Sequence, residues 1–302
     1  MTFIPLWVLA TLCAAAAQTA RNAMQRQLTA TLGTLGATLV RFLYGLPFAI
    51  LFLALVVAIT GESVPGASYS YLAQVGFASF CQIAATALML AAMRITTFSV
   101  TVAYTKTEPI QVALFGFLVL GERPSLIAIA GIMTATVGVI VMSQVRGATL
   151  FRSLAARPAL FGLASAAAFA GAAVVFRGAI LSLDDGSKLM RATTTLVFAQ
   201  AMQCVMLGGW LLIFAPRTVL ATLTAWRQSV FAGAMGALAS QFWFTGFALT
   251  STANVRTLGL VEVLFAQLVS RRLAESTTPR QIVGMVLVVA GVAALIAGHT
   301  NG

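Results

Sequence analysis

Long apolar runs follow one another along almost the whole chain, with only short polar or Gly/Pro breaks between them. A helix rises 1.5 Å per residue, so about 20 residues cross the ~30 Å hydrocarbon layer of a bilayer. The runs predict an all-α integral membrane protein with about ten transmembrane helices. The predicted spans are 4–20, 35–59, 71–93, 98–120, 126–142, 159–181, 189–214, 230–249, 255–270 and 282–297.

The composition agrees with a surface that faces lipid. Apolar residues make up 60% of the 302 positions, and charged residues only 8%. A soluble domain of this size carries about a quarter charged residues, because its surface must be wetted. Membrane lipid is therefore the expected partner over most of the surface.

The charges that remain are unevenly signed, with 18 basic and 7 acidic residues and a net charge of +11. In a soluble protein this balance would indicate nucleic acid. Here the arginines border the apolar runs, where cations contact lipid headgroups and set orientation, so no nucleic-acid partner is expected. One side of the predicted bundle receives most of them: Arg26, Arg94, Arg146, Arg152, Arg157, Arg217, Arg227, Arg271, Arg272 and Arg280. This bias predicts that side to be cytoplasmic and both termini to be external.

Residues for metal, thiol or nucleotide chemistry are sparse. Cys13, Cys81 and Cys204 are isolated within apolar runs, and the single histidine, His299, lies near the C-terminus. None has the spacing of a metal site, and no Gly-Lys-Ser/Thr phosphate loop is present. The sequence predicts no cofactor, no metal and no ATP hydrolysis.

The two halves of the chain share a pattern of glycines. Gly131 and Gly138 match Gly284 and Gly291, each pair 153 residues apart. We interpret this as a duplication near residue 150, giving five-helix repeats over 1–149 and 150–302. Because five is odd, the second copy must enter the membrane from the opposite side, as in the inverted repeats of secondary transporters. The alternative is that the two halves share only their composition.

The fourth predicted span is the richest in polar residues: Tyr104, Lys106, Glu108, Pro109 and Gln111. Pro109 removes a backbone donor and is expected to bend or open the helix. Tyr104, Glu108 and Gln111 share one helix face, whereas Lys106 lies about 200° from Glu108 around a continuous helix.

The ninth predicted span places Glu262 where Glu108 falls in the first half, with Arg256 at its start. A buried carboxylate could bind a substrate ammonium group or carry a coupling proton; simple facilitated diffusion is the other possibility. Alternatively, both glutamates pair with Lys106, Arg41 or Arg256 and only fix helix packing.

Further polar and aromatic residues are candidates for lining a pocket, namely Gln82 in the third span and Gln241 and Trp243 in the eighth. Such a wall suits an amphipathic solute, although aromatic residues of membrane helices also face lipid or pack between helices. The predicted substrate-binding set is Tyr104, Glu108, Gln111, Glu262, Gln82, Gln241 and Trp243. The predicted coupling or charge-pair set is Lys106, Glu108, Glu262 and Arg256. The predicted structural set is Arg41, Pro109, Gly131, Gly138, Gly284 and Gly291.

Several short motifs resemble the EamA-type branch of the drug/metabolite transporter (DMT) superfamily. The first-half motifs are Ala37-Thr38-Leu39-Val40-Arg41-Phe42, Thr107-Glu108-Pro109-Ile110 and Leu120-Gly121-Glu122-Arg123-Pro124-Ser125. The second-half motifs are Val261-Glu262-Val263-Leu264-Phe265 and Ala274-Glu275. In the second half Val263 stands where the motif has proline, and Ala274 where it has glycine. The resemblance implies ten helices, two inverted EamA units, and a central cavity open to one side at a time. It also implies cytoplasmic termini, against the arginine distribution.

Members of the family that the sequence resembles move amino acids, nucleotide sugars, sugar phosphates and other metabolites. The sequence thus predicts a secondary transporter rather than an enzyme. We expect an exporter of a small amphipathic metabolite such as an amino acid, in a bacterial inner membrane, as a monomer or homodimer. One alternative, a membrane-embedded enzyme, would need a catalytic cluster, and only His299 and the adjacent Asp184 and Asp185 are available. The other alternative is a structural or assembly subunit.

Overall fold

The computed structural model describes residues 4–95, 101, 104–143, 157–265 and 278–300, and within these ranges the regular structure is helical throughout. The all-α prediction is therefore confirmed for the described residues. Five helices there are long and apolar enough to cross a membrane: Gln27–Thr60, Tyr69–Met89, Ala159–Leu181, Lys188–Phe214 and Pro279–Gly298. Glu108–Leu120 and Leu126–Met142 are shorter apolar helices, and the count of ten stays a prediction. Parts of the predicted spans 98–120 and 255–270, the repeat boundary at 149/150, and Ala274 and Glu275 lie outside the described residues.

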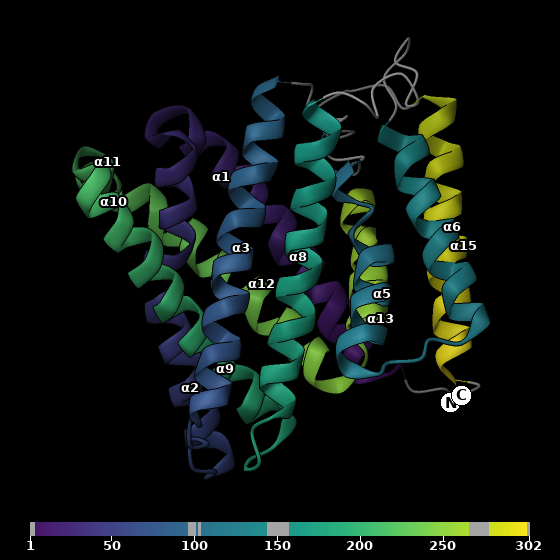
Figure 1. Cartoon of the computed structure of the whole chain (residues 1–302), viewed down its shortest axis with the longest axis horizontal. Coiled ribbons are helices and arrows are strands. Elements are labelled where there is room, and N and C mark those ends of the chain that lie inside the picture. The colour runs from purple at the N-terminus through teal and green to yellow at the C-terminus, as the bar shows by residue number, and fades with distance from the viewer. Residues whose placement is uncertain (1–3, 96–100, 102–103, 144–156, 266–277, 301–302) are drawn as a thin grey trace. The chain divides into compact units, whose positions relative to one another are not determined.

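The helices form two compact units, Met1–Ile83 with Val175–Thr250, and Ala84–Val174 with Ser251–Gly302. The first contains α1 (Leu6–Leu43), α2 (Leu46–Thr60), α9 (Lys188–Gln203), a π-helical turn (Cys204–Gly208), α10 (Gly209–Phe214), α11 (Pro216–Thr224) and α12 (Trp226–Leu249). The second contains α5 (Glu108–Leu120), α6 (Leu126–Ser143), α13 (Thr252–Leu258), a 3₁₀ turn (Gly259–Val261) and α15 (Pro279–Thr300). Helices α3 (Tyr69–Ile95) and α8 (Arg157–Leu181) contribute residues to both (Figure 1). Each unit draws on both sequence halves, so the units are not the predicted repeats, which stay a prediction.

In the first unit, the chain reverses direction within α1. Gly33 has φ 67° and ψ 178°, a conformation outside the helical region that favours glycine. The Gln25 side-chain amide donates to the Ala37 carbonyl at 3.1 Å, although these residues would lie about 18 Å apart along a straight helix. Leu28 packs in one cluster with Ala37. The first apolar segment is thus helical well beyond the predicted end at residue 20, as far as the turn at Gly33.

In the second unit, α6 and α15 lie side by side (Figure 1). A Cβ atom on Gly131 would come within 2.6 Å of the Gly291 carbonyl, and one on Gly291 within 2.6 Å of the Gly131 carbonyl. The same reciprocal contact joins Gly138 and Gly284, at 2.7 and 2.6 Å. The order of the contacts makes the two helices antiparallel. Their backbones touch because no side chain separates them, which is how small residues stabilise helix pairs in lipid.

This contact predicts that even one added methyl group is costly. Gly291→Ala should lower the thermal midpoint in detergent, because overpacking costs about 1–3 kcal/mol. Gly171→Ala in α8 is the matched control, since a Cβ atom there would meet nothing within 4 Å. It should leave the midpoint unchanged or raise it slightly, as alanine favours helix. Equal midpoints for the two variants would contradict the close packing.

Candidate functional site

The fourth predicted span is interrupted immediately before Glu108. Tyr104 and Thr105 are helical, Lys106 and Thr107 form a turn, and α5 then starts at Glu108 with Pro109 in its first turn. The Thr107 hydroxyl donates to the Tyr104 carbonyl at 2.6 Å and stabilises the turn. Proline fits the first turn of a helix because its missing N–H would have no intrahelical partner there. The helix is thus opened beside Pro109, as the sequence predicts.

The ninth predicted span changes geometry at the equivalent place. Helix α13 gives way to the 3₁₀ turn Gly259–Val261, and Glu262 follows directly. The Ser251 side chain caps α13 by accepting from the Asn254 N–H at 3.3 Å. A 3₁₀ stretch inside a longer helix commonly marks a hinge. The second segment therefore departs from α-helix before its glutamate even though Val263 replaces proline.

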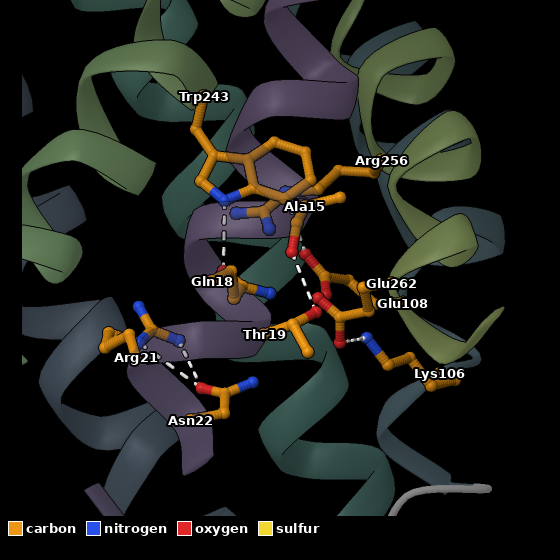
Figure 2. A network of polar contacts seen from close by, with 10 residues as sticks. All are labelled: Ala15, Gln18, Thr19, Arg21, Asn22, Lys106, Glu108, Trp243, Arg256 and Glu262. Carbon is orange, nitrogen blue, oxygen red and sulfur yellow. Dashed lines mark hydrogen bonds and ion pairs between the residues drawn. The ribbon is translucent and has the colours of Figure 1, made fainter. Parts of the chain in front are cut away.

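The charged residues of these two segments pair with each other. Lys106 Nζ contacts Glu262 Oε1, and Arg256 Nε lies 3.2 Å from Glu108 Oε1 (Figure 2). The four side chains are only 12–20% exposed. Each glutamate therefore meets a cation from the other half of the sequence. Of the three partners that the sequence left open for the glutamates, these ion pairs use Lys106 and Arg256.

Pairing across the two segments agrees with the position of Lys106 around the helix axis. On a continuous helix Lys106 points away from Glu108, and the structure indeed gives it a different partner, Glu262. An isolated charge at the centre of a membrane helix costs about 2.5–3.5 kcal/mol on insertion scales. Here each charged side chain has a partner of opposite charge, which offsets much of this cost. The four groups together carry no net charge.

The other two predicted residues of the fourth span, Tyr104 and Gln111, belong to the same unit as the ion pairs. Tyr104 is buried, and its Cβ would lie 2.5 Å from a Cβ atom placed on Gly162 of α8. The Gln111 side-chain amide reaches the Thr107 hydroxyl only at 3.5 Å, and its buried carbonyl oxygen has no hydrogen-bond partner among the described residues. Gln111 therefore retains an acceptor for a ligand in the same unit as the charge pairs.

Gln82, Gln241 and Trp243 belong to the first unit, whereas the residues of the two ion pairs belong to the second. Gln241 Nε2 donates to the Thr193 hydroxyl at 2.8 Å, and Gln82 Oε1 accepts from Gln203 Nε2 at 2.8 Å. Trp243 is 5% exposed. All three side chains thus bond inside the unit.

Three polar residues of α1 escaped the sequence prediction: Gln18, Arg21 and Asn22. Trp243 Nε1 donates to Gln18 Oε1 at 3.0 Å, and Arg21 Nη2 donates to Asn22 Oδ1 at 2.8 Å (Figure 2). Arg21 is only 7% exposed. Their close spacing was the available signal, but the predicted first span, 4–20, ends between Gln18 and Arg21 and so separates them.

Arg41, predicted to be structural, packs beside Arg21 on one glycine of α12. A Cβ atom on Gly236 would lie 3.4 Å from Cδ of Arg21 and 3.4 Å from Cγ of Arg41. The Arg41 guanidinium also lies 5.4 Å from the centre of the Phe42 ring. The missing side chain of Gly236 therefore makes room for two long cationic side chains within the first unit.

Residues 5–144 match the EamA-like transporter family. The match covers the interrupted segment around Glu108 and the glycines Gly131 and Gly138, and this family is part of the DMT superfamily. The family match and the apolar helices indicate an integral membrane protein and a membrane transporter.

The fold of this EamA-like protein also has a solved relative. A structure titled "Crystal structure of protein" superposes with a TM-score of 0.70, covering 96% of this chain and 97% of the other at 16% sequence identity. At this identity the likeness concerns the fold alone. No curated protein matches the chain.

The Glu108–Arg256 pair predicts coupled losses of stability. Glu108→Gln or Arg256→Gln alone leaves a mostly buried charge without its partner and should cost about 1–3 kcal/mol. The double variant should lose clearly less than the sum of the two, by thermal unfolding in detergent. Asp185→Asn, an exposed acid of the first unit, is the control and should change little. Strictly additive losses would show that the two side chains do not interact.

Proposed function

We propose that this EamA-like protein is a secondary transporter of zwitterionic, amphipathic metabolites such as amino acids, exporting them across a bacterial inner membrane. The proposal rests on two ion pairs, Lys106–Glu262 and Arg256–Glu108, which lie where two apolar helices are interrupted. Interrupted helices expose backbone groups where solutes bind in many transporters.

A zwitterion is the solute that these pairs can accept at least cost. Its ammonium group can replace Lys106 beside Glu262, and its carboxylate can replace Glu108 beside Arg256. The zwitterion adds one charge of each sign, so the occupied site keeps no net charge. A solute with a single charge would give the buried site a net charge, which is costly in an apolar environment.

Alternating access between two inverted repeats is the mechanism that we propose. Support comes from the glycine contacts: if residues 153 positions apart are equivalent, exchanging the halves turns the Gly131–Gly291 contact into Gly284–Gly138. A two-fold axis between antiparallel helices would produce this reciprocity. The changes of helix geometry directly before Glu108 and Glu262 are a second feature common to both halves. Inverted repeats of this kind can rock about a central site.

The proposal predicts a specific ligand pattern. Purified protein should be stabilised against heat by at least one of the twenty amino acids, because a ligand stabilises the state that it binds. The methyl ester of that amino acid lacks the carboxylate, and the corresponding deaminated acid lacks the ammonium group. Both should bind at least about tenfold more weakly, since each would give the buried site a net charge. Counterflow in proteoliposomes should follow the same order.

A matched variant makes this test specific to the site. Gln74→Ala in α3 changes a partly buried amide of the first unit and should preserve binding and counterflow. Lys106→Gln with Glu262→Gln removes the proposed ammonium site and should abolish the preference for the zwitterion over the deaminated acid. If no amino acid binds or moves, or if the blocked analogues move equally well, the substrate class is wrong.

A further inference from the structure

An open groove of about 630 Å³ lies at one end of the first unit. Thr31 and Leu32, just before the chain reversal at Gly33, form one wall. The junction of α11 and α12 forms the other wall, with Thr224, Trp226 and Arg227. The candidate span Lys188–Phe214 ends two residues before α11 begins. The groove therefore lies close to the end of a segment that is long and apolar enough to cross a membrane.

Helix α11 has the pattern of a helix that lies along a membrane surface. It is nine residues long, separates two apolar helices, and carries an exposed arginine, Arg217. Leu220 and Leu223 are 63% and 49% exposed, whereas Thr222 is buried. Exposed leucines next to a cation suit the boundary between acyl chains and headgroups.

The groove itself has the chemistry of an anion site. The Arg227 guanidinium lies 5.4 Å from the centre of the Trp226 ring, and both side chains are exposed. Hydroxyl groups of Thr31 and Thr224 and the amide of Gln228 also line the groove, and none of its lining residues is acidic. The first turn of α12 opens into it without a side-chain cap, which adds backbone N–H donors. A phosphate group would find a cation and neutral donors together.

An apolar surface for lipid chains continues from this anion site. Phe231 follows Arg227 by one helical turn on α12 and is 55% exposed. Trp226 is itself 52% exposed, and tryptophan concentrates at the level of lipid headgroups. Arg217 and Arg227 also belong to the basic side of the chain that the sequence predicts to be cytoplasmic. Anionic lipids are attracted to clustered cations on that side of a membrane.

We propose that this groove binds the headgroup of an anionic phospholipid. The lipid phosphate lies against Arg227, with the Gln228 side-chain amide and the first backbone N–H groups of α12 donating to its oxygens. The acyl chains follow the exposed apolar residues Leu223 and Phe231. The site is independent of the transported solute, and its lipid ties the α11–α12 corner and the reversal of α1 to one leaflet.

Arg280 provides a matched control for Arg227. Each is the second residue of a long helix, α15 or α12, and each is exposed. Arg227 lines the groove, whereas Arg280 does not. General attraction between anionic lipid and a basic surface would weaken equally when either arginine is replaced. A larger loss of lipid binding for the Arg227 variant would therefore locate the bound lipid at the groove.

The test is native mass spectrometry of delipidated, detergent-solubilised protein titrated with dioleoyl-phosphatidylglycerol or dioleoyl-phosphatidylcholine. We expect one phosphatidylglycerol to bind more tightly than phosphatidylcholine. Arg227→Gln should weaken phosphatidylglycerol binding about fivefold, the contribution of one arginine near a membrane surface. Arg280→Gln should stay within about twofold of wild type. Thermal unfolding of both variants without lipid verifies that the fold is intact.

Three results would overturn the proposal. Equal binding of the two lipids removes the need for an anionic headgroup. Equal losses in Arg227→Gln and Arg280→Gln would show diffuse attraction to the basic side. Displacement of phosphatidylglycerol by millimolar inorganic phosphate would show that the groove takes free phosphate instead of lipid.

Discussion

Pairing of opposite charges inside apolar helices is the interaction on which the candidate site depends. Lipid cannot solvate a carboxylate, so Glu108 and Glu262 each need a cation within reach. The chain supplies Arg256 and Lys106, and it takes each from the other half of the sequence. This crossing requires the two segments to come close, and both segments leave regular α-helix directly before their glutamates. The same geometry that gives each buried glutamate a cation therefore also produces a site with two charges of each sign.

The same constraint organises the polar groups of the first unit. Gln241 bonds Thr193, and Trp243 bonds Gln18, because amide and indole groups turned toward lipid would lose their hydrogen bonds. Where polar partners are not needed, close backbone contact replaces them, as at the glycines between α6 and α15. Arg227, by contrast, is exposed, and the lipid proposal gives it a phosphate group as its partner.

The sequence predicts features whose cause is local. The apolar runs indicate membrane helices, Pro109 indicates the interruption of the fourth span, and the motif around Glu108 indicates the family. Features set by distant contacts were not predictable in the same way. The helical angle of Lys106 excludes Glu108 as its partner but cannot select Glu262, 156 residues away. No proline near Glu262 indicates the 3₁₀ turn that precedes it. The reversal at Gly33 depends on the backbone conformation of one glycine among 25, and the sequence does not show which glycine adopts it.

The most direct test of this account is to exchange the charges of one pair. Lys106→Glu and Glu262→Lys alone each place two like charges together, so each should lose most of the folded, monodisperse protein in detergent. The double variant restores the pair in reverse orientation and should recover a thermal midpoint close to that of the wild type. Recovery would establish that the fourth and ninth segments are joined by this ion pair. A double variant no more stable than either single one, or single reversals without effect, would contradict it.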